Sequence, residues 1–239
     1  MTDTVSNIGW LTGAALNTYA ISLYAHILVV VYLLGADLGR VYLARLGGAP
    51  GASPDARLLA ARGVLFLGTV NSVALILILP AGVSLAASSG TYRMLLPTWL
   101  AATWVVTGAW LALTLAADRA TGTAGGGRLL AGLDTLVRLA LGLGNLYDGA
   151  LGFAGRSVTV GDDWFAGKLT LYGLLILVSI PVRHRSFGLR RELRLLGLVA
   201  DDATAAERLA SGLARLSLPI VLGWALILGA AWLGAAKPG

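Results

Sequence analysis

The sequence contains no cysteine among its 239 residues, and only two histidines and two methionines. Without cysteine there can be no disulfide, thiolate metal site, thiol nucleophile or covalently attached c-type haem. Charged residues are scarce as well, at 13% of the chain, against roughly 25% in an ordinary soluble domain. Hydrophobic residues make up 57%, and the mean hydropathy is +0.79. A soluble fold cannot bury so much apolar surface, so the composition predicts an integral membrane protein.

Six stretches have the length and apolarity that a helix needs to cross about 30 Å of hydrocarbon. They lie at approximately 18–43, 60–88, 97–117, 129–153, 165–183 and 213–235. Runs rich in glycine, proline and serine separate the first two segments and the third from the fourth, and such runs favour loops. We therefore predict an all-α, polytopic membrane helix bundle that forms one integral membrane domain over residues 1–239.

The most polar stretch of the chain separates the fifth segment from the sixth. From Arg183 to Ser211 it alternates apolar and charged residues at helical spacing. This pattern predicts an amphipathic cytoplasmic helix that lies on the membrane surface.

The basic residues predict the orientation of the bundle. Most of the 18 lysines and arginines follow the first, third or fifth segment, whereas Arg93, Arg156, Lys168 and Lys237 lie on the other side. Because cytoplasmic loops collect basic residues, both termini are predicted outside the cytoplasm, in the inner (plasma) membrane. The +6 charge is then assigned to contact with anionic lipid rather than to nucleic acid.

The amino-terminal region is poor in basic residues. No lysine or arginine precedes Arg40, whereas a cleavable secretory signal begins with positive charge. We expect the first apolar segment to remain in the mature protein.

Polar side chains within the predicted spans are the candidate functional residues, because ionisable groups are costly in hydrocarbon. The candidates are His26, Asp37, Asn71, Asp134, Arg138, Asn145 and Asp148. Asp134 and Arg138 are four residues apart, and Asp37 and Arg40 are three apart, so each couple can form an ion pair within one helix. Both ion pairs lie at the same predicted depth, near the cytoplasmic end of the spans. There they could form a shared ionic cluster that binds an anion, carries protons or ties helices together.

His26 is the candidate metal ligand. If the first and fourth segments are neighbours, Asn145 and Asp148 lie at the same membrane depth as His26. The Asp148 carboxylate would then make the His26 imidazole a proton relay or orient it toward a metal. The alternative is a histidine bonded to a backbone carbonyl or to water. His184 is predicted on the opposite membrane face, so two histidines of one chain cannot ligate one haem iron.

Several sequence patches resemble a known group of membrane proteins. They are the run from Tyr24 to Gly39, which includes His26 and Asp37, the run from Leu79 to Leu85, Trp99-Leu100, and the run from Trp164 to Leu169. These patches resemble an uncharacterised family of small bacterial inner-membrane proteins, distantly similar to the copper-resistance D family. The resemblance implies a multi-helix membrane protein with a link to copper, although two histidines, two methionines and no cysteine leave copper ligands scarce.

The leading hypothesis is a small permease-like protein or a non-catalytic subunit of a larger membrane complex. A polar path would run from His26 and Asp148 outside to Asp37 and Arg138 inside, with Asn71 between them. The alternative is a membrane-embedded copper or haem protein in which a homodimer brings a second His26. An enzyme has only the buried carboxylates in its favour. Because metal ligands are scarce, no cofactor is expected. Membrane lipid is the expected partner because basic loops face anionic head groups.

Overall fold

The computed structural model describes residues 17–89, 97–121, 125–157, 160–196 and 203–236. These residues form seven α-helices and no strand. The helices are α2 (Thr18–Gly48), α3 (Pro54–Ser88), α4 (Pro97–Arg119), α5 (Gly126–Phe153), α6 (Asp163–Leu196), α7 (Ala203–Ala214) and α8 (Ser217–Ala236). Six stretches of the described residues are long and apolar enough to cross a membrane, which confirms the all-α expectation and suits a multi-pass membrane protein.

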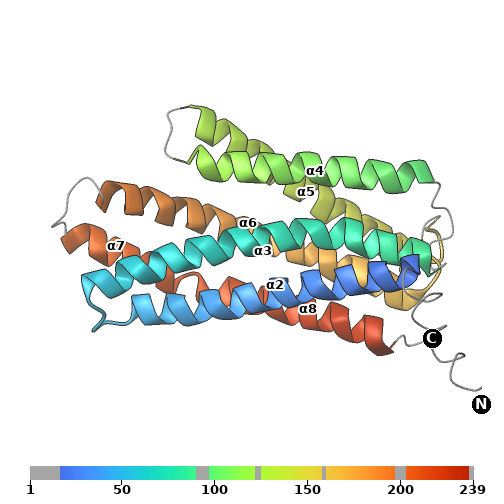
Figure 1. Cartoon of the computed structure of the whole chain (residues 1–239), viewed down its shortest axis with the longest axis horizontal. Helices are drawn as coiled ribbons and strands as arrows, with labels where there is room; N and C mark the ends of the chain where they lie inside the picture. The colour runs from blue at the N-terminus through green and yellow to red at the C-terminus, as the bar shows by residue number, and fades with distance from the viewer. Residues whose placement is uncertain (1–16, 90–96, 122–124, 158–159, 197–202, 237–239) are drawn as a thin grey trace, which may run out of the picture.

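The long helices run lengthwise through the molecule in alternating directions (Figure 1). The start of α2 and the end of α8 lie at one end, which we call the terminal end, and α7 lies at the other, the α7 end. Helix α2 packs against α3 and α8, α6 packs against α5 and α8, and α4 packs against α3 and α5. The hairpin of α4 and α5 thus lies at one side of the bundle (Figure 1).

Local signals fix several helix ends. Helix α3 starts where the Ser53 hydroxyl accepts a hydrogen bond from the Ala56 amide at 3.2 Å, with Pro54 in the first turn. Helix α5 ends at Phe153, and Gly155, two residues later, has a left-handed φ of +65°. There the Arg156 amide donates to the Leu151 carbonyl at 2.8 Å, the bond of a Schellman cap.

Burial is distributed as in a membrane protein. Arg138 and Asp134 are each 1% exposed, whereas Leu218 is 80% and Val105 72% exposed. A protein in water would show the reverse, since ionised groups gain from hydration and large apolar groups lose by it. The outer face of the bundle is therefore suited to hydrocarbon.

The predicted surface helix between the fifth and sixth spans is not confirmed. Helix α6 does not end near Arg183 but continues to Leu196. Of the polar stretch, α7 alone forms a separate helix, and it packs against α2, α6 and α3. Its Leu209 and Leu213 are buried in an apolar cluster with Leu189 of α6. The apolar face of this stretch thus contacts other helices, and its placement on a membrane surface stays a prediction.

Helices α5 and α6 approach closely through glycines. A Cβ on Gly173 would lie 2.7 Å from the Gly142 carbonyl oxygen and 3.1 Å from the Leu146 amide nitrogen. Because both atoms are backbone, no side-chain movement could make room for it. Small residues at such contacts let helices in a membrane approach each other.

We expect Gly173→Ala to lower the thermal unfolding midpoint of the detergent-purified protein, with a loss of about 1–3 kcal/mol typical of an overpacked contact. Gly144→Ala, in the facing helix, is the matched control, because its Cβ would have no atom within 4 Å. The control should leave the midpoint unchanged or raise it slightly. Equal midpoints for the two variants would contradict the close approach of α5 and α6.

Candidate functional site

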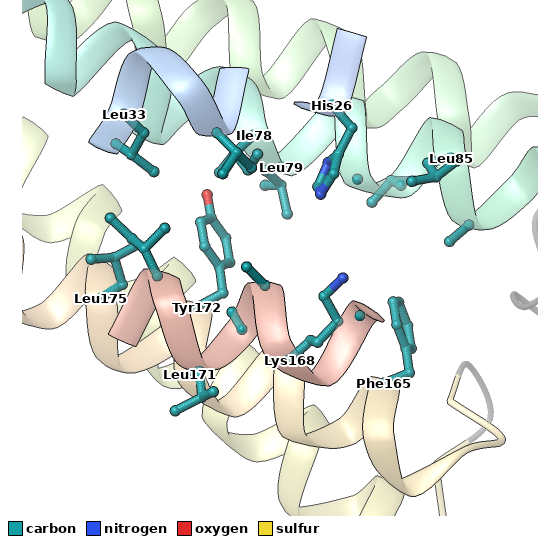
Figure 2. Close-up of a pocket in the computed structure, with 18 of the residues that line it drawn as sticks. His26, Leu33, Ile78, Leu79, Leu85, Phe165, Lys168, Leu171, Tyr172 and Leu175 are labelled. Carbon is teal, nitrogen blue, oxygen red and sulfur yellow. The ribbon is translucent and has the colours of Figure 1, made fainter. Parts of the chain in front are cut away.

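A cavity lies at the terminal end of the bundle, between α2, α3, α6 and α8. Its volume is about 350 Å³, and we call it the outer cavity. Aliphatic and aromatic side chains form most of its wall, and its polar side chains include His26 of α2 and Lys168 and Tyr172 of α6. His26 and Lys168 point toward one another from opposite walls (Figure 2).

The polar groups of the outer cavity are held by their neighbours. The His26 ring packs against Gly82, where a Cβ would lie 3.5 Å from its Cε1 atom. Its Nδ1 atom is buried and has no hydrogen-bond partner among the described residues. The Lys168 ammonium lies 5.7 Å from the centre of the Trp164 ring, a favourable position for a cation. Deeper in the cavity, the Tyr172 hydroxyl donates to the Leu75 carbonyl at 3.0 Å.

Two smaller cavities continue from the outer cavity toward the α7 end. The middle cavity, of about 30 Å³, shares Leu33 and Leu175 with the outer cavity and is also lined by Asp37 and Asn71. The inner cavity, of about 20 Å³, shares Asn71 and Arg40 with the middle one. The three cavities therefore follow one another along the interior of the bundle.

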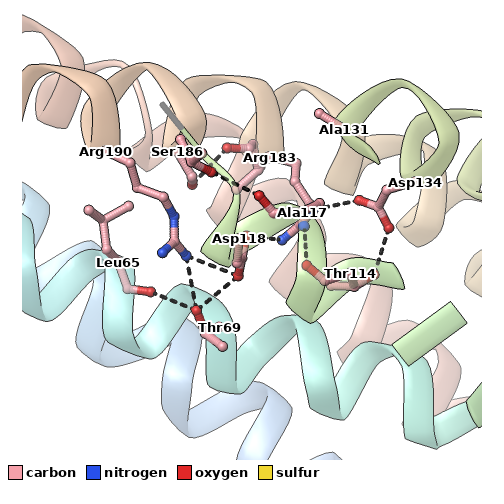
Figure 3. Close-up of polar contacts among 12 residues, drawn as sticks. Leu65, Thr69, Thr114, Ala117, Asp118, Ala131, Asp134, Arg183, Ser186 and Arg190 are labelled. Atoms are coloured by element: carbon pink, nitrogen blue, oxygen red, sulfur yellow. Dashed lines mark hydrogen bonds and ion pairs between the residues drawn. The ribbon is translucent and has the colours of Figure 1, made fainter. Parts of the chain in front are cut away.

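Asp134 of α5 is the centre of a buried polar network. It accepts hydrogen bonds from Trp110 Nε1 at 3.1 Å, Thr114 Oγ1 at 2.6 Å, Arg138 Nε at 3.1 Å and Arg183 Nε at 2.6 Å. These donors come from α4, α5 and α6. One carboxylate thus joins three helices (Figure 3).

Asp118, near the end of α4, extends the network toward the α7 end (Figure 3). Its Oδ1 atom lies 3.1 Å from Arg183 Nη1, and its Oδ2 atom lies 3.0 Å from Arg190 Nη2. The Thr69 hydroxyl of α3 also donates to Oδ2, at 3.1 Å. Arg183 and Arg190 of α6 are therefore both paired with α4.

The two ion pairs expected from sequence spacing are confirmed. Arg138 Nε lies 3.1 Å from Asp134, and Arg40 Nη1 lies 3.0 Å from Asp37. Both pairs are almost fully buried, and both arginines line the inner cavity. Asn71 donates to the Leu33 carbonyl at 3.2 Å and lies beside them in the cavity lining.

Asn145 and Asp148 are not among the described residues that line the outer cavity with His26. Asn145 donates to the Leu141 carbonyl of its own helix at 2.8 Å, and Asp148 accepts from the Ser157 hydroxyl at 2.8 Å. Asp148 thus ties the loop after α5 to that helix. Because α5 packs against α6 and α4 rather than against α2, it is Lys168 of α6 that faces His26.

Sequence reasoning missed four charged members of the interior. The sequence places Lys168 on the outer side and Arg183 and Arg190 in a cytoplasmic stretch. Asp118 is not among the candidate residues, because it follows the predicted third span of 97–117. The periodicity of α6 contains the missing signal, since Val182 and Leu189 are buried together in one apolar cluster, seven residues apart. The helical face therefore continues through the charged stretch.

A metal site has little support in this arrangement. Among the described residues, no group of three histidines, cysteines, aspartates or glutamates could hold a metal ion. His26 has a lysine opposite it, and an ammonium group repels a metal cation. Haem or copper bound at His26 remains a hypothesis that requires a second chain.

We expect Asp134→Asn to destabilise the protein by about 3–5 kcal/mol, because it leaves Arg138 and Arg183 buried without their shared carboxylate. The measurement is the free energy of unfolding in detergent. Glu192→Gln is the control, since its partner Arg208 has a side chain 49% exposed, and such pairs contribute about 0–1 kcal/mol. Similar small losses for both variants would show that the Asp134 network is not required for stability.

Comparisons with protein-family models, with curated proteins and with solved structures find no match to this chain. The resemblance to relatives of the copper-resistance D family therefore stays a prediction.

Proposed function

We propose that this chain is a small permease-like protein of the bacterial inner membrane, with both termini outside the cytoplasm. Its six apolar helices and the charge bias of its loops support this placement. In this orientation the terminal end faces outward, and the α7 end, with Arg183 and Arg190, faces the cytoplasm.

The observation that carries the proposal is the outer cavity. Its volume of about 350 Å³ lies within the range of roughly 300–1,000 Å³ that is typical of ligand sites. Such sites combine apolar walls with a few placed polar groups, and here those groups gather around His26 and Lys168. A cavity of this kind, open among four helices near one membrane face, suits a solute that enters from that side.

The middle and inner cavities supply the continuation that a permease needs. Leu33 and Leu175, shared by the outer and middle cavities, form an apolar constriction between them. Tyr172 and its hydrogen bond to the Leu75 carbonyl fasten α6 to α3 at this depth. Separation of α6 from α3 would join the cavities, and the described conformation is then the outward-facing one of an alternating pair.

The lining selects the chemical class of the solute. Lys168 contributes a positive charge to the lining of the outer cavity. The remaining wall is largely apolar. A small organic anion with an apolar body satisfies both features, since its charged group pairs with the ammonium while its body contacts leucine and phenylalanine side chains.

The polar path differs from the one expected from sequence. It runs from His26 and Lys168 past Asn71 to Arg40 and Arg138. Asp148 is not among the lining residues of the three cavities.

Uptake into proteoliposomes tests the proposal. The probe is radiolabelled butanesulfonate, which stays ionised at neutral pH and so does not leak through lipid as a neutral acid. We expect saturable uptake above that of empty liposomes, and Lys168→Met should reduce the initial rate at least tenfold, which corresponds to about 1.4 kcal/mol. Failure of the wild-type protein to exceed empty liposomes would refute this function.

Arg156→Gln is the matched control for the transport assay. Arg156 is an exposed cation near the same end of the bundle, but it does not line the outer cavity. Its loss should leave uptake unchanged. If both variants reduced uptake equally, general surface charge rather than Lys168 in the cavity would explain the effect.

A further inference from the structure

The inner cavity has an unusual lining. Four arginines surround it, Arg40, Arg138, Arg183 and Arg190, together with hydroxyl and amide groups that include Ser179, Ser186 and Asn71. No carboxylate is among the described residues that line it. Asp37, Asp134 and Asp118 each pair with at least one of these guanidinium groups.

Within the described part of the chain, the charges around this cavity do not balance. Asp37, Asp118 and Asp134 provide three negative charges for four guanidinium groups. A guanidinium group keeps its proton in proteins, so the excess positive charge cannot be removed by titration. An uncompensated charge in a buried site is costly. One monovalent anion would neutralise the excess positive charge of this cavity.

Hydrogen-bond donors are left over at the same place. Arg40 Nε, Arg138 Nη2 and Arg190 Nε are buried and have no hydrogen-bond partner among the described residues. Arg40 is 2% and Arg138 1% exposed, so bulk solvent does not reach them. Buried donors in folded proteins are normally paired, and here three of them belong to the lining of one cavity.

The size of the cavity limits its occupant. Its volume of about 20 Å³ compares with the roughly 10–15 Å³ that one water molecule requires. The cavity therefore holds a single small particle. Gly68 of α3 lies against Arg40, since a Cβ there would be 3.4 Å from Arg40 Nε, and its lack of a side chain leaves that edge of the guanidinium open.

We propose that the inner cavity is a binding site for one small monovalent anion of the halide class. The anion accepts hydrogen bonds from the unpaired N–H groups of Arg40 and Arg138. Its negative charge neutralises the excess positive charge of the network. Arg190, whose side chain is 21% exposed, forms the mouth toward the α7 end. The site does not depend on transport, because a bound halide would neutralise the network whether or not a solute crosses the bundle.

Bromide is the probe for this site. The detergent-purified protein is equilibrated in sodium gluconate, whose anion is too large for the cavity, and titrated with sodium bromide at constant ionic strength. We expect a saturable rise of the thermal unfolding midpoint. Crystals soaked in bromide should give an anomalous peak in contact with Arg40 Nε and Arg138 Nη2. No rise and no peak would overturn the proposal and leave water as the occupant.

Arg190→Gln tests the charge argument. It leaves three arginines for three aspartates, and Arg183 still pairs with Asp118, so the variant should fold. We expect its bromide affinity to fall at least tenfold and its midpoint in gluconate to equal or exceed that of the wild type. Arg194→Gln removes an exposed arginine one turn further along α6 and should respond to bromide as the wild type does. Equal bromide responses in Arg190→Gln and the wild type would contradict the proposal.

The binding and transport experiments fail separately. Bromide binding in detergent without sulfonate uptake in liposomes would retain the anion site and remove the permease function. Uptake of the sulfonate without bromide binding would retain the permease function and remove the anion site.

Discussion

An ionised side chain that lies away from water needs a partner of opposite charge, and the interior of this bundle is arranged around that requirement. Asp134, 1% exposed, accepts hydrogen bonds from four side chains on three helices. In a membrane, apolar side chains gain little by turning from lipid to one another, so polar contacts and close packing decide which helices associate. The Asp134 network therefore specifies how α4, α5 and α6 lie together.

The interior differs in character between the two ends of the bundle. At the terminal end the interior is a largely apolar cavity with Lys168 and His26 near its mouth. At the α7 end the interior is charged and nearly filled, with a cavity of about 20 Å³ among four arginines. The carboxylates that pair with Arg183 and Arg190 come from the hairpin of α4 and α5. The charges of α6 are thus neutralised by carboxylates of another pair of helices.

Much of the fold could be predicted because it depends on properties that are local in the sequence. Helix spans follow from apolar length, and the Asp134–Arg138 and Asp37–Arg40 pairs follow from spacing within one helix. Contacts between helices could not be predicted in this way. The opposition of His26 and Lys168 requires α2 and α6 to face each other, and the match of Asp118 with Arg183 requires the long arginine side chain of α6 to reach α4. The charged composition after Pro181 concealed the continuation of α6, because polarity there indicated a surface position.

The orientation of the chain in the membrane tests this account most directly, and the absence of cysteine makes it accessible by single substitutions. Arg156→Cys lies in the connection after α5, at the terminal end, and Arg208→Cys lies on α7; both wild-type side chains are exposed. A membrane-impermeant maleimide applied to intact cells should label Arg156→Cys and should label Arg208→Cys only after lysis. Labelling of both variants in intact cells, or of Arg208→Cys alone, would contradict an outward-facing outer cavity and a cytoplasmic arginine network.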